Sequence, residues 1–175
     1  MKTSLALIGF MGTGKTAVGR ALARRLGKEF VELDALIESR AGQKVAAIFR
    51  QEGETRFREL EIEAVKEMAG RQNTVIACGG GVVLNWINIE RLKKECLIVY
   101  LTASTEVILK RLSGDAGERP LIAVPDRAAQ IRALGQFRRP FYERAGDIKI
   151  DTSKMSVDEV VEEIITRLRD YEAKN

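Results

Sequence analysis

The residues GFMGTGKT at positions 9–16 restrict the fold of this 175-residue chain more than any other stretch. They fit the pattern G-x-x-x-x-G-K-S/T, in which glycines let backbone N–H groups converge on phosphate oxygens. The apolar run at 4–8 predicts a buried strand before the loop, and residues 15–26 predict a helix after it. A strand, a glycine-rich loop and a helix in this order predict a site for a nucleoside triphosphate, with ATP as the default.

The loop and the first turn of its helix supply the candidate nucleotide ligands. Lys15 is expected to reach the β- and γ-phosphates, and the Thr16 hydroxyl is expected to bind Mg²⁺. The helix that begins near Lys15 adds the positive end of its dipole. No N-K-x-D motif is present, which argues against a guanine nucleotide. The candidate nucleotide-binding residues in this stretch are Gly12, Thr13, Gly14, Lys15, Thr16 and Ala17.

Short apolar runs alternate with amphipathic stretches along the rest of the chain. This alternation indicates an α/β fold with a parallel sheet covered on both faces, whose ligands bind at the carboxyl ends of the strands. Ser156 and Glu159 fit a capping box that opens the last helix. Residues 113–125 contain two glycines and two prolines and are predicted to form a mobile loop. The remaining strands are expected at 30–33, 74–78, 97–101 and 147–151, and the remaining helices from Asp34 and at 45–51, 54–69, 86–94, 105–112 and 126–144.

The amino-acid composition limits the kinds of catalytic site, metal site and partner that the chain can have. The chain contains no histidine, which excludes serine–histidine and cysteine–histidine nucleophiles and most zinc sites. Cys78 and Cys96 are expected to be reduced, half-buried thiols of a cytoplasmic protein. The net charge of +4 comes without a long Lys/Arg run, which favours small anionic ligands and predicts no nucleic-acid partner. No apolar run approaches the roughly 18 residues that cross a membrane, so no membrane partner is expected.

Six segments resemble the shikimate kinase family in their order and spacing: GFMGTGKT, LDALIE (33–38), EGETRFRELE (52–61), CGGGVV (78–83), ERPL (118–121) and LGQFRRPFY (134–142). The resemblance covers essentially the whole chain. It implies a single domain, residues 1–175, with the three-layer P-loop kinase fold, in which helices flank a five-stranded parallel sheet of order 2-3-1-4-5. It implies a monomer that uses ATP and Mg²⁺ to phosphorylate the 3-hydroxyl of shikimate in aromatic amino-acid biosynthesis. It also implies a shikimate-binding helical segment at about 34–62 and a mobile lid at about 113–125.

The resemblance assigns Arg58 and Arg138 to the shikimate carboxylate, and guanidinium groups suit this task because they form bidentate pairs. Glu61 lies three residues after Arg58 and could orient it; the alternative is an ordinary surface pair on a helix. The spacing L-x-x-x-R-x-P-x-Y selects Arg138 over Arg139. Two aromatic residues either wall the pocket or belong to the core, namely Phe49 and Phe57.

Asp34 and three glycines complete the expected acceptor site. The resemblance implies that Asp34 binds the shikimate hydroxyls and orients or deprotonates the attacking one; the alternative is a helix N-cap. Without a histidine, Asp34 is the best candidate base. Gly79, Gly80 and Gly81 are expected to bring backbone amides to the acceptor, with Gly80 as the direct contact; the alternative is a tight turn.

The resemblance assigns two further arginines to the nucleotide. Arg119, in the expected lid, contacts the transferring phosphate, which makes it a candidate catalytic residue together with Asp34 and Lys15. Arg111 is expected to stack near adenine. Lys154 either lines the adenine site or is an ordinary surface lysine.

One position departs from the family pattern. Where the family has Asp-x-Asp at the end of the second strand, this chain has Glu32-Leu33-Asp34. The first acid is the one that holds Mg²⁺ through water, so Glu32 is the candidate here, with a side chain one methylene longer. Either Glu32 serves in place of the aspartate, or the affinity for Mg²⁺ differs from that of the family.

Two other functions are alternatives to the phosphorylation of shikimate. A kinase of the same fold could act on gluconate or a nucleoside monophosphate, but the three glycines with Arg58 and Arg138 favour shikimate. A nucleotide-binding module without catalysis would be expected to lack Asp34, Lys15 or Arg119, and all three are present.

Overall fold

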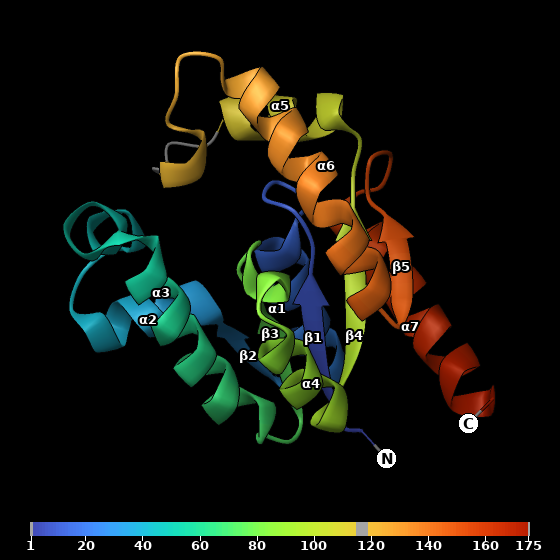
Figure 1. The fold of residues 1–175 in the computed structure, drawn as a ribbon. Helices are drawn as coiled ribbons and strands as arrows, with labels where there is room; N and C mark the ends of the chain where they lie inside the picture. The colour runs from blue at the N-terminus through green and yellow to red at the C-terminus, as the bar shows by residue number, and fades with distance from the viewer. Residues whose placement is uncertain (1, 115–118, 175) are drawn as a thin grey trace.

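The computed structural model describes residues 2–114 and 119–174 and has a parallel β-sheet at its centre (Figure 1). Its five strands lie in the order β2-β3-β1-β4-β5, and every neighbouring pair is parallel. The predicted sheet topology is therefore confirmed. The strands are β1 (Ser4–Ile8), β2 (Glu29–Glu32), β3 (Thr74–Ala77), β4 (Cys96–Thr102) and β5 (Ile148–Asp151).

Helices cover both faces of the sheet and give the molecule three layers (Figure 1). In β1, Leu5 and Leu7 pack with α1 and α7, whereas Ala6 and Ile8 pack on the other face with α3, α4 and α6. Because successive strand residues point to opposite faces, a strand buried on both sides requires such a continuous apolar run. The helices are α1 (Lys15–Leu26), α2 (Leu33–Ala41), α3 (Val45–Ala69), α4 (Trp86–Glu95), α5 (Thr105–Ser113), α6 (Arg127–Ala145) and α7 (Val157–Lys174), with short 3₁₀ turns η1 (Val82–Leu84) and η2 (Pro120–Ile122).

Two predicted helix details are confirmed. Before α7, the Ser156 backbone N–H donates to Glu159 Oε2 at 2.7 Å, and the Glu159 N–H donates to Ser156 Oγ at 3.2 Å. This reciprocal pair is the capping box. In α3, Gly53 has φ 85° and ψ 169°, which interrupts the helix and separates the two expected pieces.

Some expected boundaries and exposures were wrong. Strand β2 ends at Glu32, and Leu33 is the first residue of α2, because its apolar side chain reaches the core from the helix. Cys78 and Cys96 are buried and unpaired rather than half-buried, because they flank the innermost strands.

The expected loop at 113–125 is only partly irregular. It contains η2, which begins at Pro120, a residue whose fixed φ suits the first position of a helical turn. Residues 115–118 of the expected lid lie outside the described residues. Within the ranges 2–114 and 119–174, no helix combines the length and the apolarity needed to cross a bilayer.

Candidate active site

The loop between β1 and α1 is shaped by its glycines. Gly12 and Gly14 have φ of 76° and 97°, a region where a side chain is strained. Thr13 lies between them with its side chain buried, and its hydroxyl donates to the Phe10 carbonyl at 2.8 Å. Thr13 can therefore contact a nucleotide only through its backbone. Gly14 is the N-cap of α1, so the first N–H groups of that helix are available to an anion.

Lys15 is held by the loop that precedes it. Its Nζ donates to the carbonyls of Gly9 and Phe10, both at 2.8 Å. Burial lowers the pKa of Lys15 to about 8, although the negative charge of Asp34 acts in the opposite direction. The positive charges of Arg119 and Arg138 lower this pKa further. These three neighbours come from distant parts of the sequence, so the fold gathers the predicted charged residues around Lys15.

A cleft of about 310 Å³ lies at the carboxyl ends of β1, β2 and β3. This is the edge at which open parallel sheets bind ligands. Besides Met11, Ala77 and Cys78, its lining consists of residues predicted from the sequence. These are Gly12, Gly14, Lys15, Thr16, Ala17, Glu32, Asp34, Gly79, Gly80 and Arg119.

Asp34 lies in the first turn of α2 and is not its N-cap. The N-cap is Glu32, which makes no side-chain capping bond, so the N-cap alternative for Asp34 is wrong. The Oδ1 atom of Asp34 is enclosed and has no hydrogen-bond partner among the described residues. Burial raises the pKa of Asp34, and Lys15 opposes this rise. The carboxyl group thus faces the cleft with an oxygen available to a ligand.

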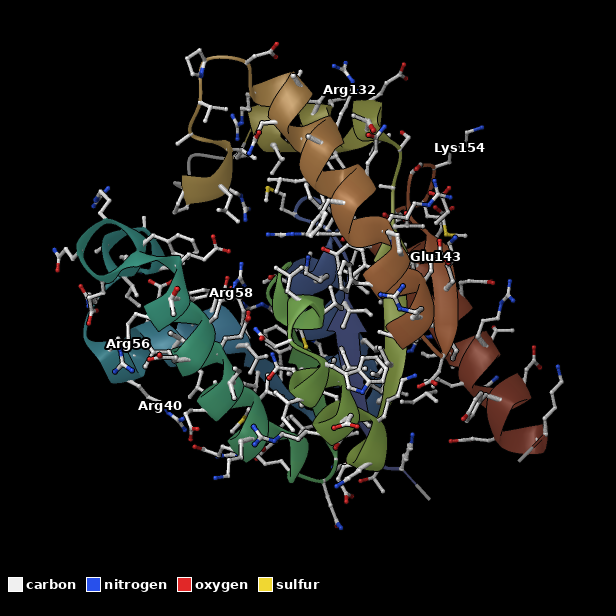
Figure 2. All side chains as sticks on the ribbon, viewed as in Figure 1. Arg40, Arg56, Arg58, Arg132, Glu143 and Lys154 are labelled. Atoms are coloured by element: carbon white, nitrogen blue, oxygen red, sulfur yellow. The ribbon has the colours of Figure 1, made fainter. Side chains whose placement is uncertain are left out.

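Arg58 and Glu61 form a buried pair rather than an ordinary surface pair. Arg58 Nη1 lies 3.0 Å from Glu61 Oε1, and Arg58 Nη2 lies 3.1 Å from Glu54 Oε1. The Glu61 side chain is 0% exposed and that of Arg58 only 13%. Burial raises the pKa of Glu61 to about 7, against the opposing effect of Arg58. Figure 2 shows Arg58 on the inner side of α3 and Arg56 on its outer side.

The segment Gly79–Gly81 provides space for side chains from other elements. A turn does form here, because the Val82 N–H donates to the Gly79 carbonyl at 3.1 Å. None of the three glycines has a positive φ, so the turn itself does not require glycine. A Cβ at Gly79 would lie 2.9 Å from Asp34 Oδ1 and 3.1 Å from Glu61 Oε2. A Cβ at Gly81 would overlap the Arg58 guanidinium. Glycine at positions 79 and 81 therefore lets charged side chains approach the backbone closely.

Arg138 and Arg139, the two arginines between which the motif spacing selects, differ in their burial. Arg138 is 3% exposed and lies at the glycine segment, with Nη1 3.4 Å from where a Gly80 Cβ would stand. The Arg139 side chain is 72% exposed and pairs with Glu143. Enclosed Arg138 Nε has no hydrogen-bond partner in the described part of the chain.

Arg111 joins loops on the nucleotide side of the site. Its Nη1 donates to the Gly12 carbonyl at 3.1 Å and to Thr152 Oγ1 at 3.0 Å, and its Nη2 donates to the Thr152 carbonyl at 2.9 Å. The buried Thr152 hydroxyl also lies 3.1 Å from the Thr13 carbonyl and 3.2 Å from that of Thr102. Sequence reasoning missed Thr152; the available signal was a hydroxyl directly after a strand whose carboxyl end faces the site.

The aromatic and lysine alternatives divide clearly. Phe57 is buried and belongs to the core, whereas Phe49 is partly buried beside it, with ring centroids 5.0 Å apart. Lys154 is exposed at the periphery (Figure 2). Its position agrees with the surface-lysine alternative.

Comparisons with known proteins identify the family to which this chain is similar. The shikimate kinase family model matches residues 11–169. The shikimate kinase of Geobacter sulfurreducens is 48% identical over 169 residues, which cover 97% of this chain and 92% of that protein. The shikimate kinase of Symbiobacterium thermophilum is 45% identical over 168 residues, covering 95% and 97%. A solved structure of shikimate kinase from Acinetobacter baumannii in complex with shikimate has a TM-score of 0.93 and 34% identity, covering 98% of this chain and 95% of that one. The chain belongs to the shikimate kinase family.

Proposed function

We propose that this protein transfers the γ-phosphate of ATP to the 3-hydroxyl of shikimate, within aromatic amino-acid biosynthesis. The observation that carries this proposal is the meeting of a phosphate-binding loop with unpartnered polar atoms that suit a hydroxylated carboxylate. Asp34 Oδ1 and Arg138 Nε are both enclosed and lack hydrogen-bond partners among the described residues. Because unpaired buried polar groups are costly, atoms of this kind indicate a ligand site.

On the nucleotide side, Lys15 and the backbone of residues 12–17 bind the phosphates. Lys15 must exchange its bonds to the Gly9 and Phe10 carbonyls for phosphate oxygens, which are stronger acceptors for an ammonium group. Arg119 lines the same cleft and brings positive charge to the transferring phosphoryl group. Arg111 positions the loops around the nucleotide, and its planar face is proposed to stack on adenine.

On the acceptor side, Arg58 and Arg138 bind the shikimate carboxylate. Glu61 orients Arg58 through the 3.0 Å ion pair, so the guanidinium reaches the site with its direction fixed. The segment Gly79–Gly81 lets the acceptor approach the backbone. The helical segment at about 34–62 is accordingly proposed to supply much of the acceptor site.

Asp34 is proposed to accept a hydrogen bond from the 3-hydroxyl and to hold it in line with the phosphorus atom. The pKa of Asp34 is raised, which brings it nearer to the pKa that suits a general base at neutral pH. Phosphoryl transfer states are loose in most analyses, so orientation contributes more than full deprotonation before attack.

Mg²⁺ fits the residues that face the cleft. The Thr16 hydroxyl and the Glu32 carboxylate both line it, and oxygen donors with retained waters are what this cation prefers. Thr16 would bind it directly and Glu32 through water. When bound, Mg²⁺ neutralises charge on the β- and γ-phosphate oxygens.

We further propose that the segment at about 113–125 acts as a lid that carries Arg119. The protein is proposed to work as a monomer in the cytoplasm, without nucleic-acid or membrane partners.

The acceptor is tested by a coupled ADP-release assay with shikimate, gluconate, CMP and AMP. ADP release should depend on shikimate, and ³¹P NMR of the product should locate the phosphate on the 3-hydroxyl. Turnover with another acceptor but not with shikimate would refute the proposal.

A Gly81→Ala substitution should raise KM for shikimate by about tenfold or more, because the new methyl group displaces the Arg58 guanidinium and its charge-assisted bonds. The displaced group is the end of a flexible side chain, so the protein should still fold. The matched control is Gly135→Ala on α6, where a methyl group would meet nothing within 4 Å and should leave KM unchanged. Steady-state kinetics and a thermal melt of both variants decide the matter. Equal KM values in the two variants would contradict the spatial role of Gly81.

A further inference from the structure

Tyr142 contacts the segment Gly79–Gly81 from the core of the protein. It lies on α6, is 1% exposed, and its hydroxyl donates to the Gly80 carbonyl at 2.5 Å. Its ring stacks on Tyr100, with centroids 5.3 Å apart and an interplanar angle of 22°. The stack fixes the ring, so the direction of the hydroxyl is set by the core of the protein.

The same hydroxyl also faces Arg138. Arg138 precedes Tyr142 by four residues, which places both side chains on one face of α6. The Arg138 guanidinium lies against the Tyr142 hydroxyl, and its charge lowers the pKa of Tyr142. Burial has the larger effect and holds this pKa above its usual range, so the hydroxyl keeps its proton. A phenol has one donor and two acceptor positions, so it can accept from Arg138 while it donates to Gly80.

The contact with Gly80 restrains an otherwise permissive segment. Three consecutive glycines have no side chain to limit their backbone conformations. In a trans peptide the carbonyl and the following N–H point in opposite directions, so a fixed Gly80 carbonyl also fixes the Gly81 N–H. The position of Gly81 matters because its Cα lies against the Arg58 guanidinium.

We propose that Tyr142 is a positioning residue for the acceptor, which sets the orientation of the Gly80–Gly81 peptide and of the Arg138 guanidinium through one buried hydroxyl. This role rests on the proposed function, because it assumes that Arg138 and the glycine segment receive shikimate. Tyr142 is not among the residues that line the phosphate cleft. It acts through its two neighbours and takes no part in the chemical step.

The test is Tyr142→Phe, which removes one oxygen and keeps the ring. KM for shikimate should rise about tenfold, the loss expected for a hydrogen bond to a charged group, whereas KM for ATP should stay within about twofold. The matched control is Tyr100→Phe, which removes the hydroxyl from the other ring of the same stack. This control should leave both KM values unchanged.

Further arms separate the possible outcomes. In an Arg138→Lys background, Tyr142→Phe should raise KM less than in the wild type, because its action passes through the guanidinium. Unchanged KM for shikimate in active Tyr142→Phe overturns the positioning role alone. Equal increases for shikimate and ATP overturn it too, because they indicate general structural damage. Failure of the wild-type protein to phosphorylate shikimate would instead refute the proposed function.

Discussion

Replacing Asp34 by asparagine should lower kcat with shikimate by about 10²- to 10⁴-fold, the usual loss for a general base. Asparagine has nearly the same shape but carries no negative charge and cannot accept the proton of the 3-hydroxyl. ATP should still bind, because the phosphate loop and Lys15 remain. Single-turnover kinetics with shikimate, together with calorimetric titration of ATP, would measure the two effects separately.

The pH of this experiment matters. Asp34 raises the pKa of Lys15, which burial lowers to about 8, so the asparagine variant will lose the Lys15 proton at a lower pH than the wild type. A pH profile of kcat for both proteins therefore separates the loss of the Lys15 charge from the loss of the Asp34 carboxylate. The matched control is Asp158→Asn, which makes the same change at an exposed aspartate in the first turn of α7 and should leave kcat unchanged. An Asp34→Asn protein with nearly wild-type kcat would leave Asp34 without a catalytic role.

Replacing Arg58 by alanine should raise KM for shikimate by about 100-fold. A guanidinium can bind a carboxylate through two charge-assisted hydrogen bonds, and each such bond is worth about 1.5–3 kcal/mol. KM for ATP should change by less than about threefold on the same reasoning. The change also leaves Glu61, which is 0% exposed, without its cation. With a pKa already raised to about 7, Glu61 should then take up a proton rather than remain a buried charge.

The control for Arg58 is Arg56→Ala. Arg56 lies two residues earlier on α3, with a side chain 48% exposed, and pairs with Glu52 and Glu59 on the outer side of the helix (Figure 2). It should leave both KM values unchanged. Combining Arg58→Ala with Glu61→Gln should recover melting temperature but not shikimate affinity. Equal losses of ATP and shikimate binding in Arg58→Ala would assign this arginine a structural role only.

The phosphate loop was the part of the site that the sequence predicts best. Its residues are consecutive, and the strand and helix around it carry their own apolar patterns. The two helical pieces on either side of Gly53 were also predicted, because each has its own periodicity. Sequence patterns of this kind are local, and here the local preferences are consistent with the tertiary fold.

The environment of Gly79–Gly81 was not predictable in the same way. The sequence suggested either a turn or an acceptor contact, and the structure shows a third reason, the close approach of Asp34, Glu61 and Arg58. These partners lie on α2 and α3, elements that precede the glycines by roughly twenty to forty-five residues. The bond from Tyr142 to Gly80 spans 62 residues. No local pattern reports contacts formed when separate elements pack together.

Asp34 shows how the fold decides between a local and a tertiary role. An aspartate directly after a strand is a common helix N-cap, and this was the alternative to the acceptor role that the resemblance implied. The helix begins one residue earlier because Leu33 is buried as its first residue. The carboxylate is consequently turned toward the cleft, and the tertiary fold overrides the local preference.

The hydroxyl of Thr152 has a mechanical consequence. It contacts the carbonyls of Thr13 and Thr102 and the guanidinium of Arg111, so it ties the ends of β4 and β5 to the loop before α1 and to α5. Hydrogen bonds that form one buried network polarise and strengthen one another. The nucleotide side of the cleft is therefore expected to move as one rigid body. Displacement on substrate binding is then expected at the proposed lid and at α3, whose helix is interrupted at Gly53.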